Sequence, residues 1–147
     1  MTYEELYDEW INQPYEDSCT EKFEIRDGIA IIPEGTTEIG KYAFAVCNSL
    51  KSVTIPELVT KIEVCTFEGC TSLESIVVAD GNSVYDSREG CNAIIETTTN
   101  TLIQGCKTTV IPESVTEIGK RAFECCTSLK SITIPESVTE IEEYAFN

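Results

Sequence analysis

The sequence has eight cysteines and 26 acidic residues but no histidine, and this composition limits the chemistry that the chain can perform. Without histidine, the Ser-His-Asp and Cys-His arrangements that activate a nucleophile are excluded. No two cysteines have Cys-x-x-Cys spacing, which disfavours a zinc site, because zinc usually needs clustered ligands. These residues therefore predict neither nucleophilic catalysis nor structural zinc.

Carboxylates are the remaining reactive groups. Acidic pairs such as Glu142 with Glu143 have the groups for acid–base catalysis, but without a pocket a solvated surface is the better interpretation. Oxygen ligands for calcium occur at Asp80, Asn82 and Asp86, although their spacing is not that of an EF-hand loop. We therefore expect no catalytic residue, no metal and no cofactor, and we interpret the chain as a protein that is not an enzyme.

The cysteines fall into two groups by position. Four recur at positions of a repeat where a thiol packs as a small apolar side chain: Cys47, Cys70, Cys106 and Cys126. Four others lie outside those positions, and their disulfide state stays open: Cys19, Cys65, Cys91 and Cys125. Cys91 with Cys106 is the best candidate disulfide, because a hairpin between them would bring its two ends together.

The formal charge of −16 limits the classes of partner. Such a field repels nucleic acid and anionic lipid, and it favours basic protein surfaces or cations. No run approaches the roughly 18 apolar residues needed to cross a bilayer, so we expect no membrane insertion. Residues 1–10 contain four acidic and no basic side chains, which is not the pattern of a secretory signal, and the localisation stays open.

A repeat of 23 residues runs through most of the chain. Prolines mark it, because Pro33 and Pro56 are 23 residues apart, as are Pro112 and Pro135. One unit between them has 33 residues. The units are 33–55, 56–78, 79–111, 112–134 and a partial unit 135–147. A single unit buries too few apolar side chains to offset the entropy lost on ordering it, so the units must stack.

The repeat predicts an α/β solenoid with one unbroken apolar core. Alternation of apolar and polar residues predicts parallel strands near 29–32, 52–55, 75–78, 108–111 and 131–134 on one face. The apolar spacing from Ile39 to Cys47 predicts a short helical turn on the opposite face. Recurring phenylalanines should form one row inside: Phe44, Phe67, Phe123 and Phe146.

The two ends and the long unit depart from this pattern. Apolar residues on one helical face between Tyr3 and Ile11 predict an N-terminal cap helix in residues 1–27, ahead of the repeat domain 28–147. Within the long unit, segments 92–97 and 101–105 predict a β-hairpin that projects from the stack. The chain stops before the next cysteine position, and we expect either a longer array or self-association through this C-terminal edge.

The exposed face of the predicted parallel sheet is the best candidate binding surface. It would be a concave platform about 20 Å across, given the usual strand spacing. Its rows contain Lys51, Ser52, Thr54, Glu74, Ser75, Val77, Lys107, Thr108, Val110, Lys130, Ser131 and Thr133. The alternative is that these hydroxyl and β-branched residues are present only because strands favour them.

The repeat positions resemble those of the BspA-like leucine-rich repeat family over residues 29–147. The similarity is carried by segments such as Ile111–Gly119, Ala122–Phe123 and Cys126–Leu129. The resemblance implies a protein-binding module of a cell-surface or secreted microbial protein, with partners that include host matrix proteins. The alternative is a structural spacer, or a repeat segment that assembles with itself without a dedicated ligand.

Overall fold

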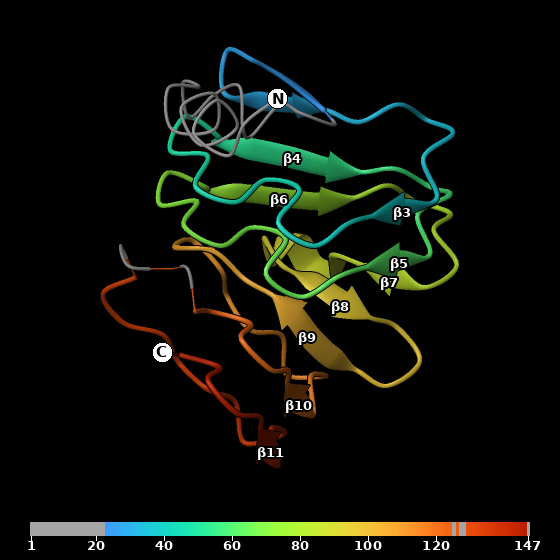
Figure 1. Ribbon diagram of the computed structural model, residues 1–147. Coiled ribbons are helices and arrows are strands. Elements are labelled where there is room, and N and C mark those ends of the chain that lie inside the picture. The colour runs from blue at the N-terminus through green and yellow to red at the C-terminus, as the bar shows by residue number, and fades with distance from the viewer. Residues whose placement is uncertain (1–22, 125, 127–128, 147) are drawn as a thin grey trace, which may run out of the picture.

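Three small sheets form the described part of the chain, residues 23–124, 126 and 129–146, in this computed structural model (Figure 1). The first sheet has the order β1-β2-β4-β6, with β1 at Glu24–Arg26, β2 at Ile29–Ile31, β4 at Ser52–Ile55 and β6 at Ser75–Val78. Strands β2, β4 and β6 are parallel, and β1 is antiparallel to β2. The predicted strands 52–55 and 75–78 are confirmed, and the strand at 29–32 is one residue shorter.

Shorter strands form the other two sheets. A two-stranded sheet pairs β3 (Glu38–Ile39) with β5 (Lys61–Ile62). A five-stranded sheet has the order β11 (Glu140–Ile141), β10 (Glu117–Ile118), β9 (Thr101–Gln104), β8 (Ile94–Glu96) and β7 (Tyr85–Asp86). One 3-10 turn, η1, covers Arg88–Gly90. The Tyr85 hydroxyl accepts a hydrogen bond from the Ile62 backbone N–H at 3.2 Å, and this bond links β5 to the five-stranded sheet.

The predicted helical turns are wrong, and the described residues are strand-rich rather than α/β. Residues 41–46 form turns, in which Tyr42 and Val46 have φ angles of 61° and 60°. Backbone N–H groups of Phe44 and Val46 donate to Thr66 and Glu68 of the next repeat, at 2.8 and 2.6 Å. A left-handed residue cannot continue an α-helix, and these donors are no longer available to one. Across the described residues, no helix has the length and apolar character needed to cross a bilayer.

The helical face from Tyr3 to Ile11 that predicted the cap lies outside the described part of the chain. Residues 23–27 of the predicted cap 1–27 are not helical, because Glu24–Arg26 form β1. The predicted strands 108–111 and 131–134 are wrong, because neither segment joins a sheet. The long unit explains why no strand forms at 108–111. It places Ser87 and Asn92 beside β6, where their side chains accept hydrogen bonds from the Val78 and Ile76 N–H groups, at 2.9 and 3.4 Å.

The hairpin of the long unit exists, but it does not project from the stack. Strands β8 and β9 are antiparallel, and β9 also pairs in parallel with β10 (Figure 1). Ile94, Ile95 and Leu102 are fully buried. Since these three apolar side chains would be exposed on a projecting hairpin, their burial accounts for its place within the sheet.

The interior consists of two clusters, so the predicted unbroken core is also wrong. The first contains Phe44 and Phe67, stacked at 5.3 Å between ring centroids. The second contains Phe123, which stacks on Phe146 at 5.0 Å. Between these two rows, the long unit has Gly105 next to the ring of Phe123 rather than another phenylalanine. Strand β8 borders both clusters, with Ile94 in the first and Ile95 in the second.

The contact between Gly105 and Phe123 gives a test of this packing. A Cβ atom at residue 105 would overlap the Phe123 ring, so Gly105→Ala should destabilise the fold by about 1–3 kcal/mol. Phe123→Ala should cost about 3–5 kcal/mol. In the double variant, Gly105→Ala should add less than about 1 kcal/mol, because the ring is gone. Urea unfolding of the wild type, the two single variants and the double variant measures the coupling between the two sites. If the losses in free energy of unfolding were additive, the contact between Gly105 and Phe123 would be contradicted.

Candidate functional site

Register in the first sheet aligns the predicted binding residues into rows. Ile29 pairs with Ser52 and Ser52 with Ser75, which gives a row that is largely hydroxyl-bearing. Thr54 pairs with Val77 in the next row, and both side chains are exposed. Because alternate residues of a strand face the same side, these rows share the surface opposite the buried Val53 and Ile76.

The structure extends this surface beyond β6 without a further strand. The Thr108 hydroxyl donates to the Glu74 carbonyl, and the Lys107 ammonium lies 3.9 Å from the Glu74 carboxylate. Val110 is 72% exposed. At the other side, the stem of Lys51 lies against Gly28, where a Cβ atom would be 3.2 Å from the lysine side chain.

The remaining predicted residues, Lys130, Ser131 and Thr133, are exposed but belong to no strand. The predicted five-strand platform is therefore a three-strand parallel surface with an irregular margin at 107–110.

An apolar groove of about 580 Å³ lies where β2 and β4 end. Its walls include Ile31, Pro56 and Leu58, together with the carboxylate-bearing Glu34 and Glu57. This groove was not predicted from the sequence. A signal was present, because Leu58 occupies a repeat position that has glycine or serine in the other units, and a leucine there is 54% exposed.

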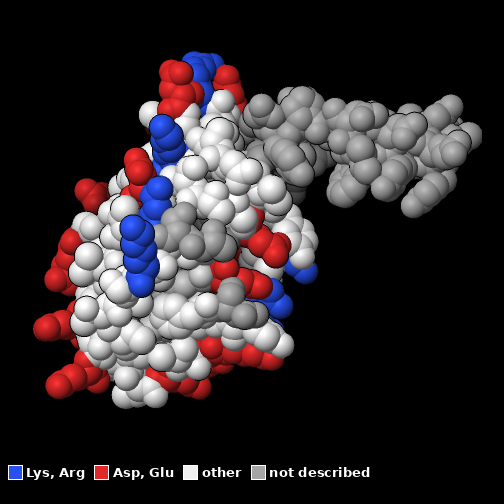
Figure 2. Space-filling model, turned by 90° about the vertical axis from the view of Figure 1, so that its left-hand side faces the viewer, with Lys and Arg blue, Asp and Glu red and all other residues white. Residues whose placement is uncertain are grey.

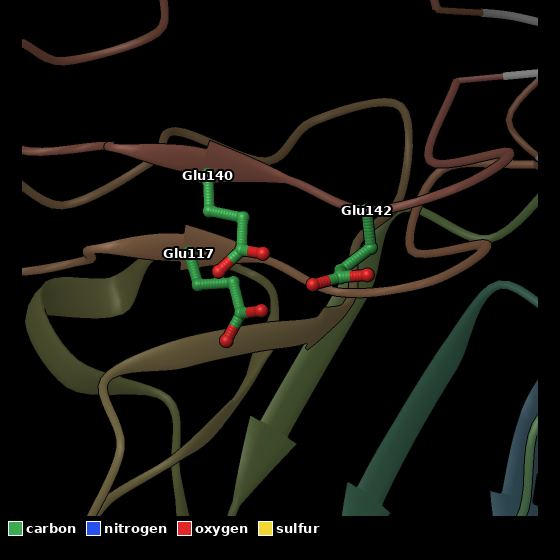
Figure 3. A group of neighbouring side chains, drawn as sticks. All are labelled: Glu117, Glu140 and Glu142. Atoms are coloured by element: carbon green, nitrogen blue, oxygen red, sulfur yellow. The ribbon is translucent and has the colours of Figure 1, made fainter.

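A second candidate site lies on the five-stranded sheet, where three carboxylates approach one another (Figure 3). Strands β10 and β11 pair Glu117 with Glu140, and the Glu142 N–H donates to the Ile118 carbonyl at 2.9 Å. One oxygen from each of Glu117, Glu140 and Glu142 lies within 4.8 Å of the others. The predicted partner of Glu142, Glu143, instead lies 4.0 Å from the Lys120 ammonium.

Hydrogen bonds with Glu117 and Glu140 raise the pKa of Glu142 from 4.5 to about 7, and repulsion from the Glu140 charge adds to this. Glu117 and Glu142 line a pocket of about 400 Å³, together with Glu63, Glu96 and Tyr85. Burial raises the pKa of the Tyr85 hydroxyl. The three carboxylates have the chemistry to share a proton or to bind a hard cation through oxygen.

Two of the three residues considered for calcium, Asn82 and Asp86, are engaged in other contacts. Asn82 accepts from the Val84 and Tyr85 N–H groups at 2.9 and 2.8 Å. Asp86 binds the Arg88 guanidinium through both carboxylate oxygens at 2.7 Å. Burial opposes ionisation of Asp86, but hydrogen bonds from Arg88 and Thr97 outweigh it and lower the pKa. This arrangement stabilises the long unit rather than presenting free ligand oxygens.

The cysteines serve packing more than chemistry. Cys91 and Cys106 are both buried free thiols, so the predicted disulfide between them is wrong. Their Sγ atoms donate instead to the carbonyls of Ala93 and Asn92, at 3.8 and 3.4 Å, and burial raises the pKa of Cys91. Cys47 is buried as predicted, but it forms a disulfide. Cys19 and Cys125 lie outside the described residues.

Comparison with known proteins identifies the repeat. Six copies of the model for the BspA type leucine rich repeat region match residues 28–104 and 94–147. No protein with a curated description matches the chain significantly.

Solved structures of bacterial proteins are similar. One is a leucine-rich repeat protein from Eubacterium ventriosum, with 30% identity and a TM-score of 0.65 over 78% of this chain and 32% of that one. Another is a leucine rich cell surface protein from Faecalibacterium prausnitzii, with 25% identity and a TM-score of 0.52 over 75% and 36% of the two chains. The pneumococcal vaccine antigen PcpA shares the fold, with 19% identity and a TM-score of 0.56 over 78% and 35%. The chain thus spans about a third of each of these proteins.

The carboxylate cluster predicts a pH dependence of stability. The folded protein holds a proton on Glu142 up to about pH 7, whereas the unfolded chain releases it near 4.5. This contribution is therefore fully present below pH 4.5 and is lost as the pH rises through 7. When the pH is raised from 4.5 to 8, the midpoint temperature of thermal unfolding should fall less for Glu142→Gln than for the wild type. Glu143→Gln is the control, and an equal effect in both variants would contradict the assignment.

Proposed function

The chain belongs to the BspA-type leucine-rich repeat family, and we propose that it is a non-enzymatic module that binds protein through the exposed face of the first sheet. The proposal includes display outside the cell and adhesion to a matrix protein. The similarity to a leucine rich cell surface protein from Faecalibacterium prausnitzii supports that placement. The net charge of −16 favours a partner with a basic surface.

The observation that carries this proposal is the set of exposed apolar side chains on that face. Ile29, Ile31 and Val77 are 52%, 40% and 44% exposed, and hydroxyl groups lie beside them. Strand propensity accounts for β-branched residues inside strands. It does not account for Val110, which is 72% exposed and belongs to no strand. Exposed apolar side chains gathered on one face are typical of interaction sites, and the hydroxyl groups between them supply orientation.

Charge changes on this face should test the proposal. Val77→Asp with Val110→Asp should weaken binding to a matrix protein about tenfold or more, because two carboxylates would be buried against an apolar contact. Biolayer interferometry against a panel of purified extracellular matrix proteins measures this. The matched control is Val46→Asp with Val64→Asp, since these valines are similarly exposed outside the first sheet. Absence of wild-type binding, or equal loss in both double variants, would refute the proposal.

Self-assembly is a second candidate function, supported by the far end of the stack. Phe146 stacks on Phe123 through one ring face, yet it is 41% exposed. Three further apolar side chains within residues 134–144, those of Ile134, Ile141 and Tyr144, are between 42% and 49% exposed. A second protein chain could cover these side chains by continuing the phenylalanine row.

Light scattering separates the two functions. If the chain assembles through this end, its molar mass should rise with concentration, and Phe146→Ser should shift that rise to higher concentrations, because the exposed ring is lost. Tyr42→Ser, which removes a similarly exposed ring elsewhere, is the control. A constant monomeric mass at millimolar concentration would exclude the assembly function.

A further inference from the structure

We propose that the groove at the ends of β2 and β4 binds a polypeptide segment in which an apolar side chain lies between basic residues. This inference rests on the proposed function, since it names the partner chemistry for one part of the same face.

The groove provides an apolar wall that its own chain leaves open. Ile31 and Leu58 are 40% and 54% exposed, and Pro56 also lines the groove. A cavity of about 580 Å³ has room for one large side chain and its neighbours. Leu58 is the residue that distinguishes this corner, because the equivalent positions in the other units are Gly35, Gly81, Ser114 and Ser137. Leu58 therefore makes this corner differ from the equivalent corners of the other units.

Two carboxylates give the groove its charge preference. Glu34 and Glu57 both line it, and neither forms an ion pair with any residue that the structure describes. Glu57 extends toward Gly81, where a Cβ atom would lie 3.0 Å from its Oε1. Lysine or arginine on either side of a bound apolar residue would meet these carboxylates, whereas an acidic segment would be repelled.

Basic side chains also lie at the other end of the same strands, but acidic side chains accompany them. Arg26 pairs with Glu24 at 2.7 Å, and the Lys107 ammonium lies 3.9 Å from the Glu74 carboxylate. Arg26 pairs in register with Ile29, and Lys51 immediately precedes β4. Basic side chains form a line on the side of the molecule where β4 and β6 begin (Figure 2). The groove carboxylates have no such partner among the described residues, so a basic segment is attracted to the groove.

The negative charge of Glu34 and Glu57 also favours one class of ligand for the groove over others. Anionic lipid and nucleic acid would bring negative charge to Glu34 and Glu57. A second copy of this chain, with 26 acidic and 10 basic residues, would do the same on average. A basic and apolar segment of another protein satisfies both the apolar wall and the carboxylates.

The test uses fluorescein-labelled pentapeptides and fluorescence polarisation with the full chain. The first peptide has leucine, tryptophan and leucine between two lysines, and the second has glutamates in place of the lysines. The lysine peptide should bind the wild type, and the glutamate peptide should bind at least about tenfold more weakly. Leu58→Ser should weaken the lysine peptide about tenfold, because it removes the apolar wall.

A matched pair of double variants isolates the carboxylates. Glu34→Gln with Glu57→Gln should weaken the lysine peptide about fivefold, the size expected for two exposed ion pairs. Glu113→Gln with Glu136→Gln makes the same change at equivalent repeat positions outside the groove lining, and it should leave binding within about twofold. Equal losses in the two double variants would show a net-charge effect only and overturn the proposal, as would undetectable binding of the lysine peptide or equal binding of both peptides.

Failure of this inference is distinguishable from failure of the proposed function. If matrix-protein binding falls with Val77→Asp and Val110→Asp but the lysine peptide ignores Leu58→Ser, the sheet face binds protein and the groove assignment is wrong. If the lysine peptide responds to Leu58→Ser as expected, the groove assignment holds even where no matrix protein in the panel binds.

Discussion

Backbone hydrogen bonds between neighbouring repeats are the interaction on which the rest of this structure depends. Several strands have only two residues, and the turns between them contain residues with positive φ, so neither a helix nor a long strand satisfies the backbone within one unit. The N–H of Thr60 donates to Thr37, that of Glu63 to Ile39, and that of Phe123 to Ala145, each in the adjacent unit. Buried backbone groups must be paired, and here the pairing requires a neighbour.

The long unit changes this pairing, and several other features follow from the change. Side chains of Ser87 and Asn92 take the place of a fourth parallel strand beside β6. Two additional strands of a hairpin enter the five-stranded sheet, and the apolar interior divides into two clusters. The first sheet therefore ends early, and its exposed face is limited to three parallel strands and a margin. The Arg88 guanidinium holds the unit together by reaching Asp86, Asn100 and Ser114.

Because stacking aligns equivalent positions of neighbouring repeats, a difference in residue type at one position changes the local charge interaction. At one repeat position, the register places Glu38 beside Lys61, and their charged groups are 3.8 Å apart. At the same position further along, Glu117 is beside Glu140, and Glu142 joins them. The first pair is attractive, whereas the second group retains a proton to about pH 7. The stack thus has an apolar and hydroxyl-rich face on one sheet and a concentrated acidic site on another.

The sequence by itself determined the repeat, the family and the parallel strands β4 and β6, because a 23-residue period and apolar alternation are local patterns that burial must respect. It also determined the pairing of Ser52 with Ser75 and of Thr54 with Val77, since equivalent positions align when units stack.

Only the tertiary structure decided whether the turns were helical, where the hairpin lay and how the core divided. Tyr42, Cys65, Arg121 and Tyr144 share a positive φ without a glycine to signal it. The place of Ile95 and Leu102 depended on which buried surface could accept them. Likewise, Glu142 acquired its neighbours through strand register and not through proximity in the sequence. Such choices depend on competition between long-range backbone partners, which a local pattern does not contain.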